Sequence, residues 1–317
     1  MNRIIKSGYK YLTDKHYRFI INTALGFHNR LNDEVFLKKT FQSNMGYSLN
    51  LENPKTFNEK LQWLKLYDHR PEYTIMVDKY LVKDFVAQKI GREHIIPTIG
   101  VWDDPKKIDF DSLPDKFVLK CNHNSGTGMC ICNDKASLDI KKVRNNLAIG
   151  MHQNYYLINR EWPYKNVQRK IIAEKYLESE QKHNDKNSIC CDLIDYKIMC
   201  FNGEPKCVFV CSERFSKDGV KVTIFDLDWK ILPFERVNHS RSKIDIPQPK
   251  MFAKMLEFSR ILSKGIPFLR VDFYEVDEKA FFGELTFFPG SGMENFTSKE
   301  WDIKLGSWLT LPEKKHE

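Results

Sequence analysis

The chain has 317 residues, of which 42% are hydrophobic and 29% charged, and its formal net charge is +8 at pH 7. This length suggests about two domains, and the apolar fraction indicates a folded globular protein. No apolar run approaches the roughly 18 residues that a membrane-spanning helix needs, so none is predicted. The eight cysteines follow neither a zinc-site nor a disulfide pattern, which favours reduced structural thiols.

Residues 1–50 are predicted to form helices that break at NRLND and QSNMG. The first 30 residues carry six lysines and arginines against one acid, Asp14. No small-residue cleavage site follows this basic start, so it is not a secretory signal and a cytoplasmic location is expected. Two interpretations stay open. The basic face is either the solvated side of a packed helix or a docking surface for the inner face of an anionic membrane or for an acidic polymer.

Residues 51–110 begin with a helix signature. Thr56 and Glu59 have the spacing of a capping box, and apolar residues then recur along one face as far as Tyr67. The stretch MVDKYLVKDFVAQKIG, residues 76–91, is predicted to be one further helix that ends at Gly91. The stretch IIPTIGVW after it predicts a short strand.

From residue 116 onward the pattern changes to strands. The predicted strands are KFVLKC, MCIC, RKIIAEKYL, LIDYKIMCF, PKCVFVCSE, VTIFDLDW, FLRVDFYEV and AFFGELTFF, with helices near 136–158 and 249–264. The dipeptide Asn202-Gly203 predicts a hairpin turn between two of these strands. The stretch HNDKNS, residues 183–188, is the best candidate for a flexible loop.

The clearest chemistry lies in a predicted hairpin, LRVDFYEVDEKAFFGELTFFPGSG, residues 269–292. Side chains alternate between the two faces of a strand, so Arg270 and Asp272 share one face. With a three-residue turn at 277–279, Asp272 lies directly opposite Glu284. Two opposed carboxylates destabilise a sheet unless a cation lies between them.

Carboxylate oxygens suit Mg²⁺ when phosphate oxygens complete its coordination shell. Asp272 and Glu284 are therefore predicted to be magnesium ligands. Two other interpretations stay open: a different turn directs one acid to solvent, or Arg270 neutralises the pair.

A second candidate site follows the predicted strand FVLKC, residues 117–121. Lys120 is expected on the face opposite to the apolar side chains. The loop NHNSGTG after it offers Ser125, Gly126, Thr127 and Gly128. A lysine beside backbone N–H groups that glycines leave accessible is typical of a phosphate site. The alternative is an ordinary turn between two strands, because the Walker A pattern is absent.

Taken in order, these segments resemble the ATP-grasp superfamily. The phrases that carry the resemblance are VDKY, FVLKCNHNSGTG, IIAEKYLE, RVDF and GELT. The resemblance implies two phosphate-binding lysines, Lys79 and Lys120. It also implies an adenine-binding hinge and a ribose-binding acid, and the residues for these roles are Glu174, Lys175, Tyr176, Leu177 and Glu180.

The same resemblance implies that Arg270 holds the reacting groups and that Thr286 joins Asp272 and Glu284 as a metal ligand. Thr286 stands where many ATP-grasp ligases have asparagine, and a hydroxyl is a weaker ligand than an amide carbonyl. Lys197, on the predicted strand IDYKIMCF, is a candidate for contacting the phosphates or a substrate carboxylate, and the alternative is a solvated lysine.

Seven phrases between about residues 50 and 310 are similar to the teichuronopeptide-biosynthesis (TupA-like) ATP-grasp proteins of bacterial surface-polysaccharide gene clusters. This resemblance implies an α+β fold in which two lobes with antiparallel sheets clamp ATP after an N-terminal helical segment. The domains expected are a basic helical segment, a region preceding the ATP-grasp fold, a lid subdomain and a C-terminal core with the metal site, at 1–50, 51–110, 111–177 and 178–317.

The activity that the resemblance implies is an ATP-dependent carboxylate–amine ligase that acts through an acyl phosphate and uses ATP and Mg²⁺. The expected partners are an amino acid or other small amine and a carboxylate-bearing glycan or glycan precursor, with PGSGMENF, residues 289–296, lining the acceptor pocket. No nucleic-acid partner is expected. The alternatives are a glycosyltransferase with a DxD motif at 226–229, a phosphotransferase on the same fold, and a polymer-binding module without catalysis.

Overall fold

The computed structural model of the chain describes residues 10–178, 193–214 and 216–314. Its α-helices are α2 (Lys15–Ala24), α3 (Asp33–Met45), α4 (Phe57–Tyr67), α5 (Pro71–Val77), α6 (Leu81–Ile90), α7 (Ile140–His152), α8 (Tyr155–Asn159), α9 (Phe252–Ser263) and α10 (Lys299–Trp308). Short 3-10 helices are η1 (Arg92–His94), η2 (Pro105–Lys107), η3 (Lys135–Ser137), η4 (Trp162–Tyr164) and η6 (Pro289–Gly292).

The strands are β1 (Thr98–Trp102), β2 (Phe117–Cys121), β3 (Met129–Cys132), β4 (Ile171–Lys175), β5 (Asp195–Phe201), β6 (Glu204–Ser212), β7 (Lys221–Phe225), β8 (Phe268–Val276) and β9 (Lys279–Thr286). Every strand predicted from residue 116 onward is therefore confirmed. The Asn202-Gly203 turn between β5 and β6 is confirmed as well, with φ angles of 51° and 86°. The predicted loop 183–188 lies outside the described residues.

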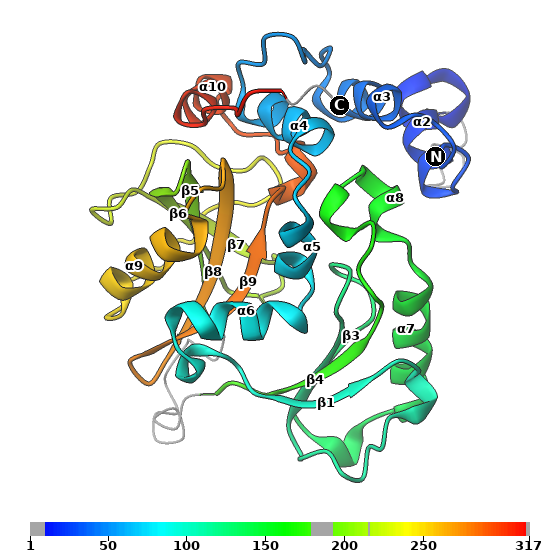
Figure 1. Cartoon of the computed structure of the whole chain (residues 1–317), viewed down its shortest axis with the longest axis vertical. Helices are drawn as coiled ribbons and strands as arrows, with labels where there is room; N and C mark the ends of the chain where they lie inside the picture. Colours follow the sequence, from blue (N-terminus) through cyan, green and yellow to red (C-terminus); the bar gives the residue numbers. More distant parts are fainter. Residues whose placement is uncertain (1–9, 179–192, 215, 315–317) are drawn as a thin grey trace.

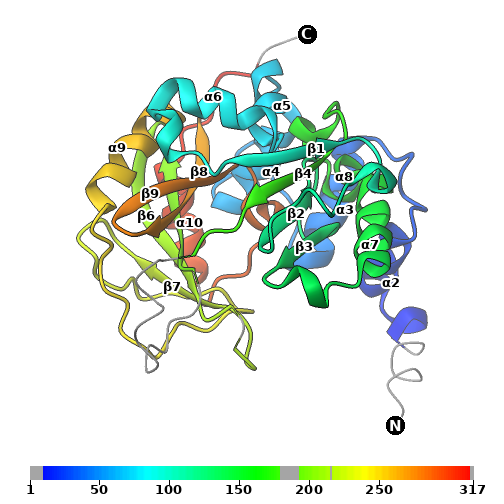
Figure 2. The same ribbon diagram turned by 90° about the horizontal axis from the view of Figure 1, so that it is seen from below.

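The strands form two antiparallel sheets in opposite halves of the molecule (Figures 1 and 2). The smaller sheet has the order β1-β4-β2-β3, and the larger has the order β7-β6-β5-β8-β9. Helix α7 packs on the smaller sheet, and α9 packs on one face of the larger sheet. The predicted α+β class with two antiparallel sheets is confirmed. Strand β1 belongs to the smaller sheet, so that sheet begins before residue 111.

Each sheet has an apolar core of its own. The larger core lies among the five-stranded sheet and helices α4, α5, α6 and α9. The core of the smaller sheet includes Phe117, Leu119 and Leu147, and a third cluster surrounds Phe36 of α3. Because the two sheets do not share a core, charged side chains can gather where the two halves meet.

The two helices predicted for residues 76–91 and 136–158 are each interrupted, and both predictions are wrong in this respect. The first is split between α5 and α6 at Asp78, whose carboxylate accepts hydrogen bonds from the backbone of Tyr80 and Leu81 and from the amide of Asn122. Because Asp78 caps the second helix in this way, Lys79 lies in the break between the helices. The second predicted helix consists of α7 and α8, separated at 153–154.

The β8–β9 hairpin differs from its prediction in its turn. The structure has a two-residue turn, Asp277 and Glu278, with φ angles of 50° and 58°, and Lys279 already pairs with Val276. The predicted three-residue turn is therefore wrong. A β-bulge between Val271 and Phe273 restores the predicted alignment farther along, since Asp272 there opposes both Gly283 and Glu284.

The N-terminal helices are held to the half of the molecule that contains the smaller sheet by one buried arginine. The side chain of Arg160 is 1% exposed, and its Nη2 donates to the carbonyls of His28 at 3.2 Å and Asn29 at 3.0 Å. Its guanidinium also stacks on the ring of Phe36 at 4.4 Å, and its Nε pairs with Asp33 at 3.0 Å. Together with Tyr156 of α8, which also donates to Asp33, this side chain joins α8 to the segment that contains α2 and α3.

We expect Arg160→Ala to lower the free energy of unfolding by roughly 3 kcal/mol, because Asp33 loses its ion pair and the carbonyls of His28 and Asn29 lose a donor. Urea denaturation measures the loss. Arg169→Ala removes an exposed arginine that donates to the carbonyl of Met151, and it should cost less than about 0.5 kcal/mol. Equal stabilities of the two variants would contradict the role of Arg160.

Candidate active site

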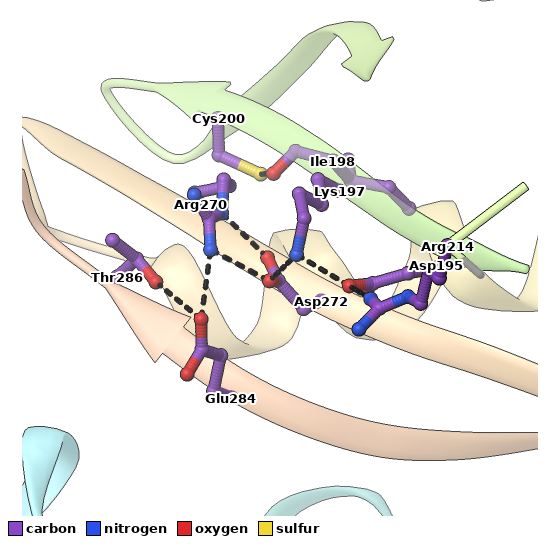
Figure 3. Close-up of polar contacts among 9 residues, drawn as sticks. All are labelled: Asp195, Lys197, Ile198, Cys200, Arg214, Arg270, Asp272, Glu284 and Thr286. Atoms are coloured by element: carbon purple, nitrogen blue, oxygen red, sulfur yellow. Dashed lines mark hydrogen bonds and ion pairs between the residues drawn. The ribbon is translucent and has the colours of Figure 1, made fainter. Parts of the chain in front are cut away.

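Five charged side chains form a row on one face of the larger sheet, called here the charged row. They are Asp195, Lys197, Asp272, Arg270 and Glu284 (Figure 3). Lys197 lies directly across from Asp272 in the β5–β8 ladder, and the alternation of side chains along β8 and β9 places the others on the same face. The opposite face of the sheet packs against α9.

Anions and cations alternate along this row. Lys197 Nζ lies 2.6 Å from Asp195 Oδ2 and 2.5 Å from Asp272 Oδ2. Arg270 donates to both oxygens of Asp272 at 2.7 Å and, through Nη2, to Glu284 Oε1 at 2.8 Å. Arg214 pairs with Asp195 at the end of the row. Lys197 is only 16% exposed, so it is a member of the row and not the solvated lysine of the alternative prediction.

Arg270 lies between the two carboxylates that the sequence placed opposite each other. Its Nη2 is within hydrogen-bond distance of an oxygen of each acid, so the two oxygens converge on one cation. This is the neutralising role that the sequence left open for Arg270. The same convergence fits a divalent cation bound together with nucleotide phosphates, because Mg²⁺ takes one or two carboxylates and obtains its other ligands from phosphate and water.

Two further oxygen atoms near the acids are consistent with a bound cation. Thr286 Oγ1 donates to Glu284 Oε1 at 3.3 Å, so it lies beside the expected ligand. Asp195 Oδ1 is buried and has no hydrogen-bond partner within the described chain. No group of three or more histidine, cysteine or acidic side chains arranged to hold a metal ion occurs within 10–178, 193–214 and 216–314. A metal bound here would therefore take part of its shell from phosphate or water oxygens.

The charged row shifts the pKa values of its carboxylates. Burial alone raises the pKa of Glu284, but Arg270, Lys79 and the other nearby lysines outweigh burial and lower that pKa to about 2. Burial also raises the pKa of Asp272, against the opposing effect of Arg270 and Lys197. The Glu284 carboxylate therefore stays ionised at neutral pH, as a ligand for a cation requires.

Two lysines from the other half of the molecule reach the same site. Lys79 and Lys120 both act on the pKa of Glu284, although their positions in the sequence are more than 160 residues away. Lys79 Nζ donates to the carbonyl of Asn124 in the glycine loop at 2.6 Å, and burial lowers its pKa. Lys120 projects from β2 on the face opposite to Phe117 and Leu119, as predicted. The fold thus brings Lys79 and Lys120 of one half near Glu284 of the other.

Glu174, the predicted partner of adenine, lies between two lysines. Lys83 Nζ is 2.6 Å from its Oε1, and Lys120 Nζ is 2.6 Å from its Oε2. Burial raises the pKa of Glu174, but these two cations outweigh burial and lower it. Lys83 was missed in the sequence. The signal that could have identified it is its position one helical turn after Lys79.

The remaining predicted hinge residues stay predictions. Lys175 ends β4, and its N–H donates to the carbonyl of Pro97. Tyr176 and Leu177 follow the strand and are partly buried. Glu180, the expected ribose ligand, lies outside the described residues.

The glycine loop between β2 and β3 has a rigid base and an open tip. Asn122 at its base is fully buried and donates to the carboxylate of Asp78, while its backbone bonds with Lys79 and Lys170. A side chain at Gly128 would collide with Cys121 Sγ at 2.7 Å, whereas Gly126 has φ of 77° and nothing within 4 Å. The exposed tip at Ser125 and Gly126 is therefore where a phosphate can approach the backbone.

A strained turn follows β9 and borders the row. Gly290, Ser291 and Gly292 all have positive φ, which is unfavourable for the serine. The carbonyls of Ser291 and Gly292 accept hydrogen bonds from two buried side chains of α4, Gln62 and Lys65. Burial lowers the pKa of Lys65 to about 8 despite nearby Glu161. These α4 residues were not predicted, because nothing in the local sequence links them to a turn 226 positions away.

A cavity opens between the charged row and the residues that follow this turn. Lys197 and Arg270 form one wall, and Pro289, Glu294 and Phe296 form another. The cavity has a volume of about 10 Å³, room for roughly one water molecule, so the acceptor pocket expected along 289–296 stays a prediction.

A family profile matches the part of the chain that contains these site residues. The profile described as TupA-like ATPgrasp matches residues 59–310. The chain belongs to the TupA-like ATP-grasp family. The match includes the charged row, Lys79, Lys120 and the glycine loop, while α2 and α3 precede it. No functionally curated protein matches the chain.

Solved structures similar to this family member include two D-alanine–D-alanine ligases. The one from Bacillus anthracis, complexed with ATP, is 15% identical with a TM-score of 0.38, and the match covers 67% of this chain and 54% of that one. The one from Helicobacter pylori is 11% identical with a TM-score of 0.41, covering 80% and 69%. The chain thus spans about half the length of the B. anthracis ligase.

The ATP-grasp ligase PsnB, complexed with its minimal precursor, Mg and ADP, is also similar. It is 10% identical with a TM-score of 0.38, and the match covers 90% of this chain and 73% of that one. At TM-scores of 0.38 to 0.41, the similarity to these enzymes does not identify the substrate of this TupA-like chain.

The low pKa of Glu284 makes stability depend on pH. Because the folded pKa is about 2, below the ordinary value of 4.5, the ionised carboxylate stabilises the fold above pH 4.5, and this stabilisation is lost as pH falls toward 2. Glu284→Gln is therefore expected to flatten the decline of unfolding free energy over this window, measured by urea denaturation at several pH values. The control is Glu257→Gln, at an exposed carboxylate that pairs with Lys254. Equal declines in the wild type and Glu284→Gln would refute the assignment.

Proposed function

We propose that this chain is an ATP-dependent carboxylate–amine ligase that acts through an acyl phosphate. It would add an amino acid or other amine to a carboxylate of a bacterial surface polysaccharide or its precursor. The observation that carries the proposal is that Arg270 joins Asp272 to Glu284, while Lys79 and Lys120 of the other half lie near enough to contribute to the low pKa of Glu284. The polysaccharide substrate is supported by membership of the TupA-like family alone.

In the proposed mechanism, one half of the molecule binds the triphosphate and the other half binds the metal ion. Lys79 and Lys120 would hold the triphosphate, and the loop tip at Ser125 and Gly126 would cover it and exclude water. Asp272, Glu284 and Thr286 would hold Mg²⁺, which when bound neutralises charge on the β- and γ-phosphate oxygens. These roles need the lysines to stay charged in a partly dry site, and Glu174 and Glu284 supply the counter-charge.

Arg270 and Lys197 would act on the reacting groups themselves. A substrate carboxylate attacks the γ-phosphate to give an acyl phosphate and ADP, and the amine then displaces phosphate to form the amide. Both steps gather negative charge on oxygen. Arg270 and Lys197 present fixed N–H donors to that charge without needing to reorient, because the acids on either side hold them in place.

The glycosyltransferase alternative depends on the DxD motif at 226–229. In the structure this motif forms a turn after β7, and Asp226 Oδ1 accepts from the backbone N–H groups of Asp228 and Lys230. The carboxylate therefore stabilises its own turn, and the motif lies apart from the charged row. The alternative of a phosphotransferase uses the same site, so only the product separates it from a ligase.

The membrane contact proposed for the N-terminus rests on composition and exposure. Helix α2 has no buried residue, and Leu12, Leu25 and Phe27 around it are 74%, 67% and 73% exposed. Within the described ranges, the structure contains no helix whose length and apolar character would let it cross a bilayer.

We expect Mg²⁺-ATP to stabilise the protein in a thermal unfolding assay, because a ligand at a hundredfold excess over its Kd contributes about 2.7 kcal/mol. Lys120→Ala and Glu284→Ala should abolish the shift. Lys141→Ala, at an exposed lysine of α7, should retain it. A shift produced by a UDP-sugar and not by Mg²⁺-ATP would favour the glycosyltransferase and contradict the proposal.

A chemical trap identifies the reaction. With ATP, Mg²⁺, hydroxylamine and glucuronate or galacturonate as the carboxylate probe, the proposed ligase should form a hydroxamate together with ADP and phosphate, since hydroxylamine captures acyl phosphates. Arg270→Met should reduce hydroxamate formation by about a hundredfold or more, while Arg169→Ala serves as the unaffected control. A phosphorylated sugar without hydroxamate would identify a kinase instead.

A further inference from the structure

Lys83 of α6 is a buried lysine to which the proposed mechanism gives no role. Its side chain is 12% exposed, and its ammonium group has one acceptor for each of its three N–H donors. Nζ donates to the carbonyl of Ile96 at 2.8 Å and to Thr98 Oγ1 at 2.8 Å, and it lies 2.6 Å from Glu174 Oε1. The donors of Lys83 are therefore used inside the protein, so Lys83 is not itself a phosphate ligand.

The acid that Lys83 contacts is shared with Lys120, which binds the triphosphate in the proposed mechanism. Glu174 lies on the inner strand β4 opposite Val118 of β2, and Lys120 follows two residues later on the same face of the sheet. Lys120 Nζ is 2.6 Å from Glu174 Oε2, so each carboxylate oxygen has one lysine. Within residues 10–178, 193–214 and 216–314, Glu174 is the partner found for Lys120 Nζ. The other N–H donors of Lys120 remain for a ligand.

The contacts of Lys83 cross the boundary between the two halves of the molecule. Helix α6 packs against α9, and its residues Val82 and Val86 belong to the apolar core of the larger sheet. Thr98 and Glu174, in contrast, are paired neighbours on β1 and β4 of the smaller sheet. Lys83 therefore connects a helix of one core to the sheet of the other.

The contact between Lys83 and Glu174 also limits what Lys120 can do. Glu174 is 4% exposed, and a carboxylate buried to this degree needs cations around it. With Lys83 on Oε1, Lys120 meets the other oxygen alone and keeps donors free. Without Lys83, both oxygens would be open to Lys120, and its ammonium group would turn onto the acid and away from the larger sheet.

We propose that Lys83 is a positioning residue for nucleotide binding, which holds Glu174 and the smaller sheet in the place that directs Lys120 at the triphosphate. This inference rests on the proposed function, in which Lys120 binds the phosphates. It also changes the role expected for Glu174, from the partner of the adenine amino group to the acid that orients a phosphate-binding lysine.

Two other roles for this pair have different consequences. If Lys83 only stabilised the fold, its removal would lower the free energy of unfolding, but the folded protein would bind ATP as before. If Glu174 bound the base, its removal would weaken the binding of adenosine and leave that of a phosphate chain unchanged. Positioning of Lys120 gives the reverse pattern, because the phosphate chain loses a correctly placed cation.

The test compares the full-length wild type with Lys83→Met and Glu174→Gln at a temperature where circular dichroism shows each protein to be folded. Affinities for Mg²⁺-ATP, for inorganic tripolyphosphate with Mg²⁺ and for adenosine are measured by competition against a fluorescent ATP analogue. Both variants should bind ATP and tripolyphosphate at least about tenfold more weakly, and adenosine as well as the wild type does.

Two matched controls and a milder variant accompany this test. Lys89→Met, at an exposed lysine of α6 that lies over the ring of Phe85, and Glu257→Gln, at an exposed carboxylate of α9, should keep all three affinities. Thr98→Val removes one acceptor of Lys83 and should weaken ATP binding by about threefold, the size of one hydrogen bond. This variant decides the question if Lys83→Met does not fold.

Three results would contradict the inference in different ways. An unchanged ATP affinity in folded Lys83→Met, or in Thr98→Val if the former does not fold, would make the contact a structural one only. A loss confined to adenosine would mean that Glu174 binds the base. No binding of Mg²⁺-ATP by the wild type would overturn the nucleotide function itself, and this result is distinct from the other two.

Discussion

The structure of the site depends on the cost of burying carboxylates. Asp195 and Asp272 are almost fully buried on one face of a sheet, and two neighbouring acids there repel each other unless cations separate them. Lys197 lies between these two acids, and Arg270 lies between Asp272 and Glu284. The alternation holds each charged group at a fixed place, and a cation at the end of this row meets two acid oxygens that already converge.

In the half of the molecule that contains the smaller sheet, buried acids and lysines also neutralise each other. Glu174 on β4 neutralises Lys83 and Lys120, and Glu284 on β9 attracts Lys79 and Lys120. Lys120 therefore lies between an acid of its own sheet, Glu174, and an acid of the other sheet, Glu284. An incoming triphosphate would find cations already assembled, and the two separate apolar cores allow these charged groups to meet at the boundary between the sheets.

Helix α4 holds the segment that follows β9 in place beside the charged row. Asn58, Gln62 and Lys65 are buried, and each bonds to the backbone of the segment that follows β9. They maintain a turn in which Ser291 has an unfavourable conformation, and this turn sets the position of Glu294. The capping box at Thr56 and Glu59 fixes where this helix begins, so a local signal in the sequence determines the placement of a distant turn.

The sequence by itself determined the strands, the Asn202-Gly203 turn, the capping box and the chemical types of the site, because each depends on alternation or on spacings of a few residues. It did not determine the two-residue turn and bulge of the β8–β9 hairpin, whose opposing shifts cancel at Asp272. Nor did it determine the break at Asp78, which is bonded to a buried asparagine 44 positions away. The pairs Lys83–Glu174 and Arg236–Glu294 join residues 91 and 58 positions apart. Only the tertiary structure decided these features, because a buried charge takes its partner from whichever segment packs against it.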